Sequence, residues 1–365
     1  MPITVPHMGN LCIPLKAMLE YVGLEVVLPP PCTKRTLSLG TQNSPEFACL
    51  PLKINLGNYI EAWELGADTI LMAGGLGPCR FGYYAQIQRE ILLDLGMDMK
   101  MVVLEPPDAS VKDFLEDIRI LANGKSWLTI IKAIQLAWYK ARAIDLVDIK
   151  LEETRPRQNH WSDADKVFDK FLRQLDRLNE KSEIYRAAEM AVDEMEAIPQ
   201  DWHYKPIKIA IVGEIYTVLE NFVNLGLEKH LGRMGVEAKR SIYLSEWIND
   251  HIFKGVLQLK SNKTLRKLAS PYLNHFVGGH GWETVGSTVE AARDGADGVI
   301  QVAPLTCMPE IVAQAILPEI SKDKNIPVMT LYVDEQTGEA GLVTRLEAFV
   351  DMIKRRKYIQ EVSGK

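Results

Sequence analysis

The sequence has no run of about eighteen apolar residues, which a membrane-spanning helix would need. It has no block of basic residues, and its formal net charge is −6, so a nucleic-acid partner is not expected. Its first residues, Met-Pro-Ile-Thr-Val-Pro-His, lack the basic stretch and apolar core of a signal peptide. We therefore expect a cytoplasmic protein with neither a membrane nor a nucleic-acid partner.

Cysteine is scarce, with five residues in 365 and no Cys-x-x-Cys pair. An odd number fits a disulfide framework poorly, and cytoplasmic cysteines more often serve metals or redox chemistry. A structural zinc site usually shows paired ligands at short spacing, and that pairing is missing. The glycines Gly74, Gly75 and Gly77 also lack the spacing of a dinucleotide or P-loop motif. We interpret them as room for a bulky group in a loop.

The cysteines that are present all lie in predicted loops or at predicted helix starts. Cys12-Ile-Pro, Cys49-Leu-Pro and Cys307-Met-Pro share one pattern, Cys79 lies in Gly-Gly-Leu-Gly-Pro-Cys-Arg, and Cys32 follows three prolines. Proline suits the first turn of a helix, where free N–H groups and the helix dipole favour negative charge. The thiolate, which is the metal ligand and the nucleophile, is therefore expected at these positions.

Apolar runs alternate with helical patterns at both ends of the chain, which predicts an α/β protein with parallel sheets. Long helices separate the two parts, and Trp127–Val147 is expected to cross from one part to the other. The predicted divisions are an N-terminal α/β domain, a helical segment, a C-terminal α/β domain and a tail without structural signal: residues 1–108, 109–200, 201–357 and 358–365. Further helices are expected over Ile248–Leu268 and Thr344–Lys357.

Cys79 follows the predicted strand Thr69–Met72, and Cys307 follows the predicted strand Gly298–Val302. Open α/β sheets bind ligands at the carboxyl ends of their strands, so these loops meet if the two sheets face each other. Several thiolates brought together from distant segments are typical of an iron–sulfur cluster.

Three segments carry a family resemblance: Pro-Glu-Phe-Ala-Cys49-Leu-Pro-Leu-Lys, Gly-Pro-Cys79-Arg-Phe-Gly-Tyr-Tyr and Gly-Val-Ile-Gln-Val-Ala-Pro-Leu-Thr-Cys307-Met-Pro-Glu. They resemble the 2-hydroxyacyl-CoA dehydratase and benzoyl-CoA reductase superfamily, and in particular its short, CoA-substrate-specific activase-related members. The resemblance implies two flavodoxin-like (Rossmann-like) parallel-sheet domains joined by the helical segment. It also implies a [4Fe–4S] cluster bound by Cys49, Cys79 and Cys307, with one iron open to substrate.

The same resemblance implies a partner, an actin-like ATPase activase with its own [4Fe–4S] cluster, which donates one low-potential electron. The reaction would be radical dehydration of a 2-hydroxyacyl-CoA or a related reduction, in a homodimer or with a related subunit. A relative with a double-cubane [8Fe–9S] cluster reduces small molecules, and Cys12 and Cys32 keep that alternative open. Two further alternatives stay open: a non-catalytic iron–sulfur scaffold or electron relay, and a metal-free binding protein.

Three further residues are candidates for catalysis: His7, Arg80 and His280. Each histidine has a loop hydrogen bond as its simpler explanation, whereas Arg80 would favour the thiolate of its neighbour Cys79. Lys16 and Lys53, which follow Cys-x-Pro-Leu, are expected to be solvated or capping lysines, with a counter-charge to a cluster as the alternative. Asp334, Glu335 and Arg345 are expected to form a structural network after the last strand.

Overall fold

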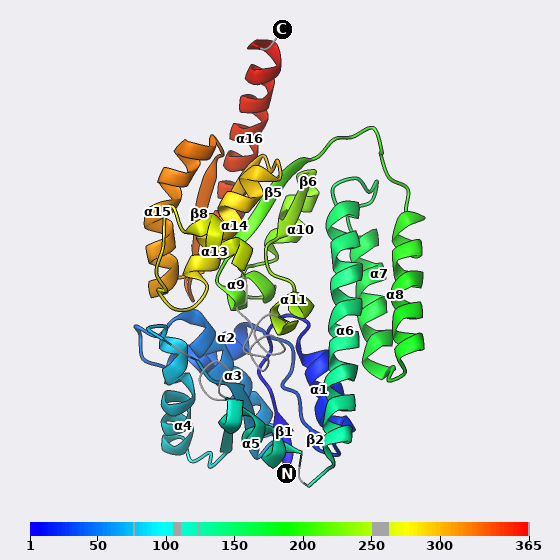
Figure 1. Ribbon diagram of the computed structural model, residues 1–365, viewed down its shortest axis with the longest axis vertical. Helices are drawn as coiled ribbons and strands as arrows, with labels where there is room; N and C mark the ends of the chain where they lie inside the picture. Colours follow the sequence, from blue (N-terminus) through cyan, green and yellow to red (C-terminus); the bar gives the residue numbers. More distant parts are fainter. Residues whose placement is uncertain (76, 105–110, 123, 250–262, 364–365) are drawn as a thin grey trace.

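The computed structural model describes residues 1–75, 77–104, 111–122, 124–249 and 263–363. It consists of two α/β halves, one above the other, with long helices alongside both (Figure 1). Each half contains a four-stranded sheet in which every neighbouring pair of strands is parallel. The predicted fold class, two flavodoxin-like parallel-sheet domains joined by a helical segment, is confirmed.

The N-terminal half has the strand order β2-β1-β3-β4. Its elements are β1 (Pro2–Thr4), α1 (Cys12–Tyr21), β2 (Glu25–Val26), α2 (Lys34–Asn43), α3 (Leu50–Glu64), β3 (Thr69–Ala73), the 3-10 helix η1 (Arg80–Tyr83), α4 (Tyr84–Asp94), β4 (Lys100–Leu104) and α5 (Val111–Leu121). The order of the strands reverses between β1 and β3, where Ile3 lies opposite Thr69. Ligands of such sheets bind beyond the carboxyl ends of the strands at this reversal.

The C-terminal half repeats this plan with the order β6-β5-β7-β8. Its elements are β5 (Ile207–Gly213), α9 (Ile215–Leu219), α10 (Leu227–Arg233), β6 (Val236–Arg240), α11 (Leu244–Ile248), α13 (Lys263–Ala269), α14 (Gly281–Arg293), β7 (Gly298–Pro304), α15 (Met308–Lys324), β8 (Val328–Val333) and α16 (Glu339–Ser363). The reversal lies between β5 and β7. Every residue of β7 is buried, as expected for a central parallel strand covered on both faces.

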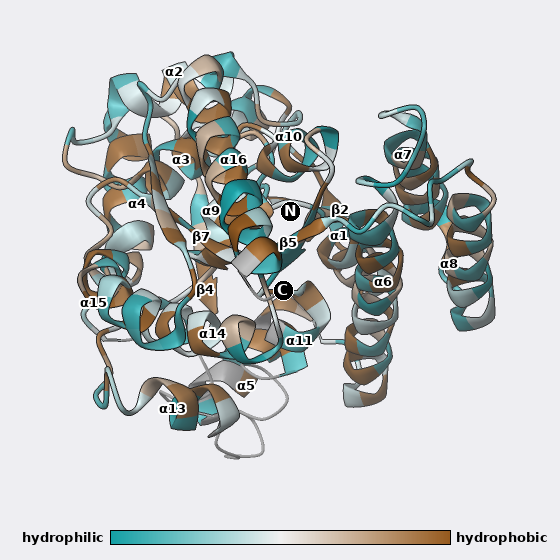
Figure 2. Cartoon of the chain, turned by 90° about the horizontal axis from the view of Figure 1, so that it is seen from above, coloured by the Kyte–Doolittle hydropathy of each residue, from teal (hydrophilic) through white to brown (hydrophobic). Residues whose placement is uncertain are grey.

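The helical segment consists of α6 (Trp127–Thr154), α7 (Asp163–Arg177) and α8 (Lys181–Glu196). Seen from above, these helices stand as a group at one side of the two halves (Figure 2). They share an apolar core that includes Val147, Phe171 and Ile184, while Lys170 and Glu194 pair on the surface. The helix α6 contacts α1 of the N-terminal half and both α11 and β6 of the C-terminal half, so the predicted crossing is confirmed.

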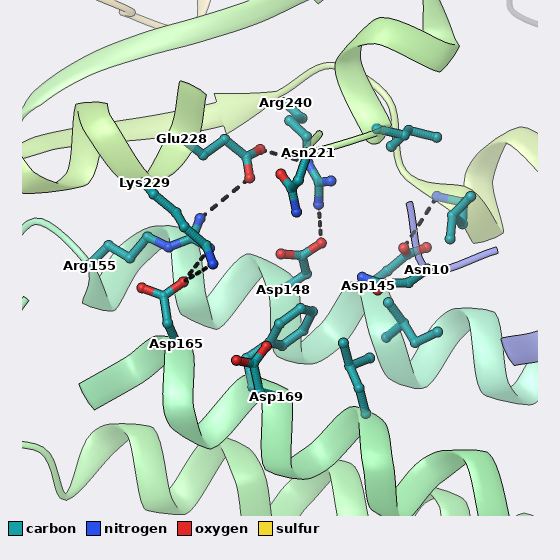
Figure 3. A pocket seen from close by; sticks show the side chains of 15 residues that line it. Asn10, Asp145, Asp148, Arg155, Asp165, Asp169, Asn221, Glu228, Lys229 and Arg240 are labelled. Atoms are coloured by element: carbon teal, nitrogen blue, oxygen red, sulfur yellow. Dashed lines mark hydrogen bonds and ion pairs between the residues drawn. The ribbon is translucent and has the colours of Figure 1, made fainter. Parts of the chain in front are cut away.

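A buried group of charged residues fixes α6 to the C-terminal half (Figure 3). Arg240 of β6 pairs with Asp148 and Glu152 of α6 and, at 2.9 Å, with Glu228 of α10. Arg155 joins Glu228 to Asp165 of α7. We call these six residues the charged junction. Its carboxylates are paired with arginines, which makes it a structural contact rather than an open binding site.

The helix α3 lies between the two halves and is buried over its first thirteen residues. Leu50 and Ile54 pack into the apolar core of the C-terminal half, whereas Leu56 and Tyr59 pack into that of the N-terminal half. Glycine permits its close contact with α2, because a Cβ atom at Gly40 would lie 1.7 Å from the carbonyl oxygen of Lys53. The helix that follows Cys49 is therefore held by both cores.

Several predicted boundaries differ from those observed. The helix α6 is longer than predicted, and α16 continues through the predicted tail to Ser363. Of the helix expected over Ile248–Leu268, the structure describes the end of α11 and most of α13, and residues 250–262 lie outside the described residues. The domain boundary expected at Glu105–Pro107 also lies outside them. The other domain limits remain predictions.

Candidate functional site

Cys49 lies at the N-terminus of α3, which is the position that its sequence context predicts. Its backbone is extended, with φ −69° and ψ 152°, and Pro51 occupies the first turn of the helix. The hydroxyl of Tyr84, at the start of α4, lies 2.5 Å from its Sγ. This contact orients the thiol at the N-terminus of α3, the helix that packs into the cores of both halves.

Cys79 and Cys307 also lie directly before helices, at the N-cap positions of η1 and α15. Pro309 occupies the first turn of α15, as Pro51 does in α3. Thr306, immediately before Cys307, has φ +69°, a left-handed conformation that is strained for a β-branched residue. Backbone strain of this kind is common where a loop presents a functional side chain.

One backbone carbonyl connects the loops of all three cysteines. The carbonyl oxygen of Phe47, two residues before Cys49, accepts a hydrogen bond from Nη1 of Arg80 at 2.7 Å. It also accepts one from Oγ1 of Thr306 at 3.3 Å. Arg80 follows Cys79 and Thr306 precedes Cys307, so this one oxygen joins segments from the two halves of the chain.

A glycine loop fits tightly against the same place. A Cβ atom at Gly278 would lie 2.8 Å from the backbone nitrogen of Cys79, and one at Gly279 would lie 3.1 Å from Cγ of Pro309 and 3.6 Å from Sγ of Cys79. Both glycines have positive φ, +85° and +47°. The loop thus forms a cradle against Cys79 and the start of α15 that any larger residue would disturb.

Two carboxyl groups of the C-terminal half act electrostatically on the cysteines: the half-buried Glu214 on all three, and the buried Glu310 on Cys79 and Cys307. Glu214 follows β5 and accepts hydrogen bonds from the backbone N–H groups of Tyr216 and Thr217. Glu310 in the first turn of α15 is fully buried and accepts hydrogen bonds from Thr284 and Gln301. Burial raises the pKa of both, that of Glu310 to about 8.

Burial also raises the pKa of all three thiols, that of Cys49 to about 11. The charge of Glu214 raises it further in each case, and Cys79 acts electrostatically on both Cys49 and Cys307. The three thiols and Glu214 therefore lie within one short-range electrostatic environment. The expectation that the helix ends favour the thiolate is wrong for the metal-free chain, because desolvation outweighs the helix dipole.

Cys12 and Cys32 form a second group, around Glu220. The charge of Glu220 contributes to raising the pKa of both thiols, after burial, and Asn58 contacts Sγ of Cys32. Cys12 is the first residue of α1 rather than its N-cap, so it does not repeat the arrangement of Cys49 and Cys307. His7 belongs near this group, since its backbone N–H donates to Asn58 and its Nε2 lies 2.9 Å from the carbonyl oxygen of Pro29. Its interactions are those of a loop residue.

The other two catalytic candidates adjoin the three cysteines. Arg80 is exposed, stacks over the ring of Phe47 at 5.9 Å and lowers the pKa of Cys79 against the dominant effect of burial. His280 lies between Gly279 and Gly281 at the start of α14. A Cβ atom at Gly281 would lie 2.3 Å from the carbonyl oxygen of Pro309, so the backbone next to His280 packs closely against the start of α15.

Lys53 and the loop after the last strand differ from expectation. Lys53 is 2% exposed rather than solvated, and it pairs with Glu335 at 2.6 Å. Lys16 is partly exposed and pairs with Asp176. The carboxylate of Asp334 accepts a hydrogen bond from Oγ1 of Thr337, and the backbone N–H of Asp334 donates to that same hydroxyl. Arg345 is exposed. The predicted network around Glu335 is therefore wrong, because the partner of Glu335 comes from the other half of the chain.

The glycines after β3 also have a different role from the one predicted. A Cβ atom at Gly77 would lie 2.6 Å from the ring of Phe276, and one at Gly75 would lie 2.8 Å from the ring of Phe81. These glycines allow the loop to pack against aromatic side chains, rather than leaving room for a group.

Sequence reasoning missed Glu214, Tyr84, Thr306 and the carbonyl of Phe47. Glu214 directly follows an apolar strand, and an acidic residue at that position could have been recognised as facing the site. The other three carry no signal, because their roles depend on backbone conformation and on contacts between segments distant in the sequence.

The donor set fits an iron–sulfur cluster, since the loops of three helix-start cysteines are joined through the carbonyl of Phe47 and two closely packed glycines, Gly278 and Gly279, lie against Cys79 and the start of α15. Among the described residues, no three His, Cys, Asp or Glu side chains lie close enough to hold a single metal ion. A cluster distributes its thiolate ligands over different irons. Within the same residues, no helix is long and apolar enough to span a membrane.

Comparison with known proteins identifies a family. No curated protein matched the chain significantly. The profile of the 2-hydroxyglutaryl-CoA dehydratase D-component family matches residues 132–353, which is more than half of the chain. The match begins in α6, ends in α16 and includes Glu214 and Cys307, whereas Cys49 and Cys79 lie before it. The chain belongs to the 2-hydroxyglutaryl-CoA dehydratase D-component family.

Proposed function

We propose that the chain is the iron–sulfur component of a two-component dehydratase system, with Cys49, Cys79 and Cys307 as the ligands of one [4Fe–4S] cluster. The observation that carries this proposal is that the loops of three helix-start cysteines, from both halves of the chain, are joined through hydrogen bonds to the carbonyl of Phe47. Family membership supports the dehydratase assignment. The closer relation to the short, activase-related members, and a cytoplasmic location, are part of the proposal.

When bound, the cluster would supply low-potential electron transfer and an iron able to bind an oxygen of the substrate. The chain would supply the three thiolates and an environment that sets the electronic properties of the group. Tyr84 would donate its hydroxyl hydrogen to the thiolate of Cys49, and Arg80 would place positive charge beside Cys79. Helix N-termini behind Cys49 and Cys307 would oppose the negative charge of the site.

We propose that the electron comes from an ATP-hydrolysing activase that carries its own [4Fe–4S] cluster. The substrate class would be 2-hydroxyacyl-CoA esters, and the reaction the radical loss of water from them, in a homodimer or with a related subunit. His280 and Glu214 are the candidates for moving protons, because the glycines beside His280 pack against Pro309 and Glu214 acts electrostatically on all three thiols. His7 is a weaker candidate than either, since its interactions lie near Cys32.

The grouping of the cysteines supports one cubane rather than a double-cubane [8Fe–9S] cluster. Glu220 acts on Cys12 and Cys32, whereas Glu214 acts on Cys49, Cys79 and Cys307. A shared double cubane would need ligands from both groups at one place. We therefore propose that Cys12 and Cys32 are not ligands.

The test is the iron and acid-labile sulfide content of the full chain purified without oxygen, with its electron paramagnetic resonance spectrum after reduction by dithionite. The proposal predicts about four of each per chain and the spectrum of a reduced cubane. About eight irons would instead favour the double cubane. Folded, oxygen-free protein that binds no iron after reconstitution with iron and sulfide would contradict the proposal.

A further inference from the structure

We infer that the ion pair between the buried Lys53 and the partly exposed Glu335 holds the loop of Cys49 in position against the C-terminal half. Lys53 lies on α3, one turn after Cys49, and its side chain is 2% exposed. Its Nζ lies 2.6 Å from Oε1 of Glu335, which follows β8 in the C-terminal half. The same nitrogen donates to the carbonyl oxygen of Glu46 at 3.1 Å.

A buried ammonium group is costly unless it is paired and hydrogen-bonded, so both partners of Lys53 are important to this part of the fold. One partner belongs to the opposite half, and the other belongs to the loop that presents Cys49. The ion pair and the hydrogen bond therefore fix three things relative to one another: α3, the Cys49 loop and the end of β8. Loss of either charged partner would leave the other uncompensated beside the site.

Two neighbouring carbonyls of the Cys49 loop are thus connected to the C-terminal half. The carbonyl of Glu46 is connected through Lys53 and Glu335, and that of Phe47 through Thr306, the residue before Cys307. Leu50 and Ile54, which flank Lys53 along α3, pack into the core of the C-terminal half. The spacing between Cys49 and Cys307 is consequently set by contacts that include this ion pair.

Lys53 and Glu335 are positioning residues, since nothing places them on substrate. The expected effect of the ion pair on iron binding rests on the proposed function, but its expected effect on the position of α3 does not. Without the ion pair, we expect the start of α3 to move relative to the C-terminal half, so that the three sulfurs no longer converge. Two measurements separate these consequences.

The first measurement needs no metal. Spin labels are placed at Tyr83→Cys and Ile311→Cys, exposed positions near Cys79 and Cys307, in the full chain with its five native cysteines changed to serine. Pulsed electron paramagnetic resonance then gives the distribution of distances between the halves. Lys53→Met should broaden this distribution, and an unchanged distribution would overturn the inference. The exposed pair Lys170–Glu194 supplies the control, because Lys170→Met should leave the distribution as it is.

The second measurement uses the chain with its native cysteines and records the rate at which iron is lost to a chelator. Lys53→Met and Glu335→Gln should each accelerate the loss about tenfold or more, as removal of an outer-shell partner does in metal sites. In the double variant, the rate of iron loss should be close to that of one single variant and not to the product of the two increases, because both substitutions break the same ion pair.

The outcomes distinguish the two proposals. Wild-type chain without iron would contradict the proposed function, while the distance measurement would still decide the role of Lys53. Wild-type chain with iron, together with variants that keep its rate of iron loss and its spectrum but unfold at a lower temperature, would make the ion pair a stabilising contact and overturn the inference.

Discussion

Carboxyl groups that are buried or half-buried occur in two parts of this chain, the charged junction and the cysteine site, and their surroundings differ. At the junction, Arg240 pairs with Asp148, Glu152 and Glu228. At the cysteine site, Glu214 and Glu310 accept hydrogen bonds from neutral groups, and within the described residues no lysine or arginine forms an ion pair with either. Three thiols that act as metal ligands would add further negative charge there.

The comparison indicates that the charged junction is structural and that the acidic groups of the cysteine site are suited to binding a positively charged group. At the junction each carboxyl group contacts an arginine, so its residues serve to hold α6 against the C-terminal half. The cysteine site concentrates acidic groups in a desolvated place, which is unfavourable unless a cation is bound. The positively charged core of an iron–sulfur cluster would offset part of that negative charge. The two regions should therefore respond differently to the same kinds of substitution.

The largest expected effect is on stability, from removal of the cation at the junction. Arg240→Met would leave Asp148, Glu152 and Glu228 with one arginine, Arg155, between them. Breaking a buried ion pair by removing one partner typically costs about 3–5 kcal/mol. Denaturant unfolding should show a loss of this size, whereas Lys170→Met, on an exposed pair, should cost less than about 1 kcal/mol. Equal losses for both variants would contradict the structural role of the junction.

The second effect concerns pH and also belongs to the junction. Burial, with the neighbouring charges of Glu228 and Asp148, raises the pKa of Glu152 to about 8, against the opposing charge of Arg240. The native state thus keeps a proton that the unfolded chain releases above about pH 4.5. The resulting stability is complete below that pH and is lost as the pH rises through about 8.

The measurement is the free energy of unfolding between pH 5 and pH 8, for the wild type and for Glu152→Gln. Glu152 contributes a fall of at most about 1.4 kcal/mol per pH unit to the wild-type curve. Glutamine keeps the size of the side chain and cannot titrate, so the variant should have the shallower slope. Parallel curves for the two proteins would show that Glu152 does not titrate in this range.

The third effect is small in stability but specific to the cysteine site. Gly279→Ala places a Cβ atom at φ +47°, 3.1 Å from Pro309 and 3.6 Å from Sγ of Cys79. Gly295→Ala is the matched control, because Gly295 has φ +82° with nothing within 4 Å of its Cβ position. Both variants should lose about 1 kcal/mol of stability from the left-handed backbone. Only Gly279→Ala should release iron faster than the wild type. Equal rates of release from both variants would show that the glycine loop does not affect iron binding.

Much of the fold could be predicted from the sequence. Apolar strands followed by helical patterns indicate parallel sheets, and the structure confirms two of them. The Cys-x-Pro pattern predicts the placement of Cys49 and Cys307 before helices, because proline is restricted to the first turn. Cys12 shares the pattern without the placement, since a turn at Met8–Leu11 begins its helix one residue earlier.

The rest of the site depends on contacts that no local pattern contains. From the sequence, Lys53 is expected to be solvated. It pairs with Glu335 because α3 lies between the two halves, and nothing near Lys53 in the sequence predicts that position. The carbonyl of Phe47 connects the cysteine loops only because Thr306 has a left-handed backbone and the side chain of Arg80 extends to it. The pKa values of the thiols depend on burial, which outweighs the helix dipole that the sequence suggests.

The most direct test compares two cysteine substitutions, one from each group. Iron per chain is measured in Cys307→Ser and in Cys32→Ser, both purified without oxygen beside the wild type. We predict that Cys307→Ser loses most of its iron, while Cys32→Ser keeps the wild-type content of about four. Loss of iron from Cys32→Ser, or retention of a full complement by Cys307→Ser, would contradict the assignment of Cys49, Cys79 and Cys307 as the ligands.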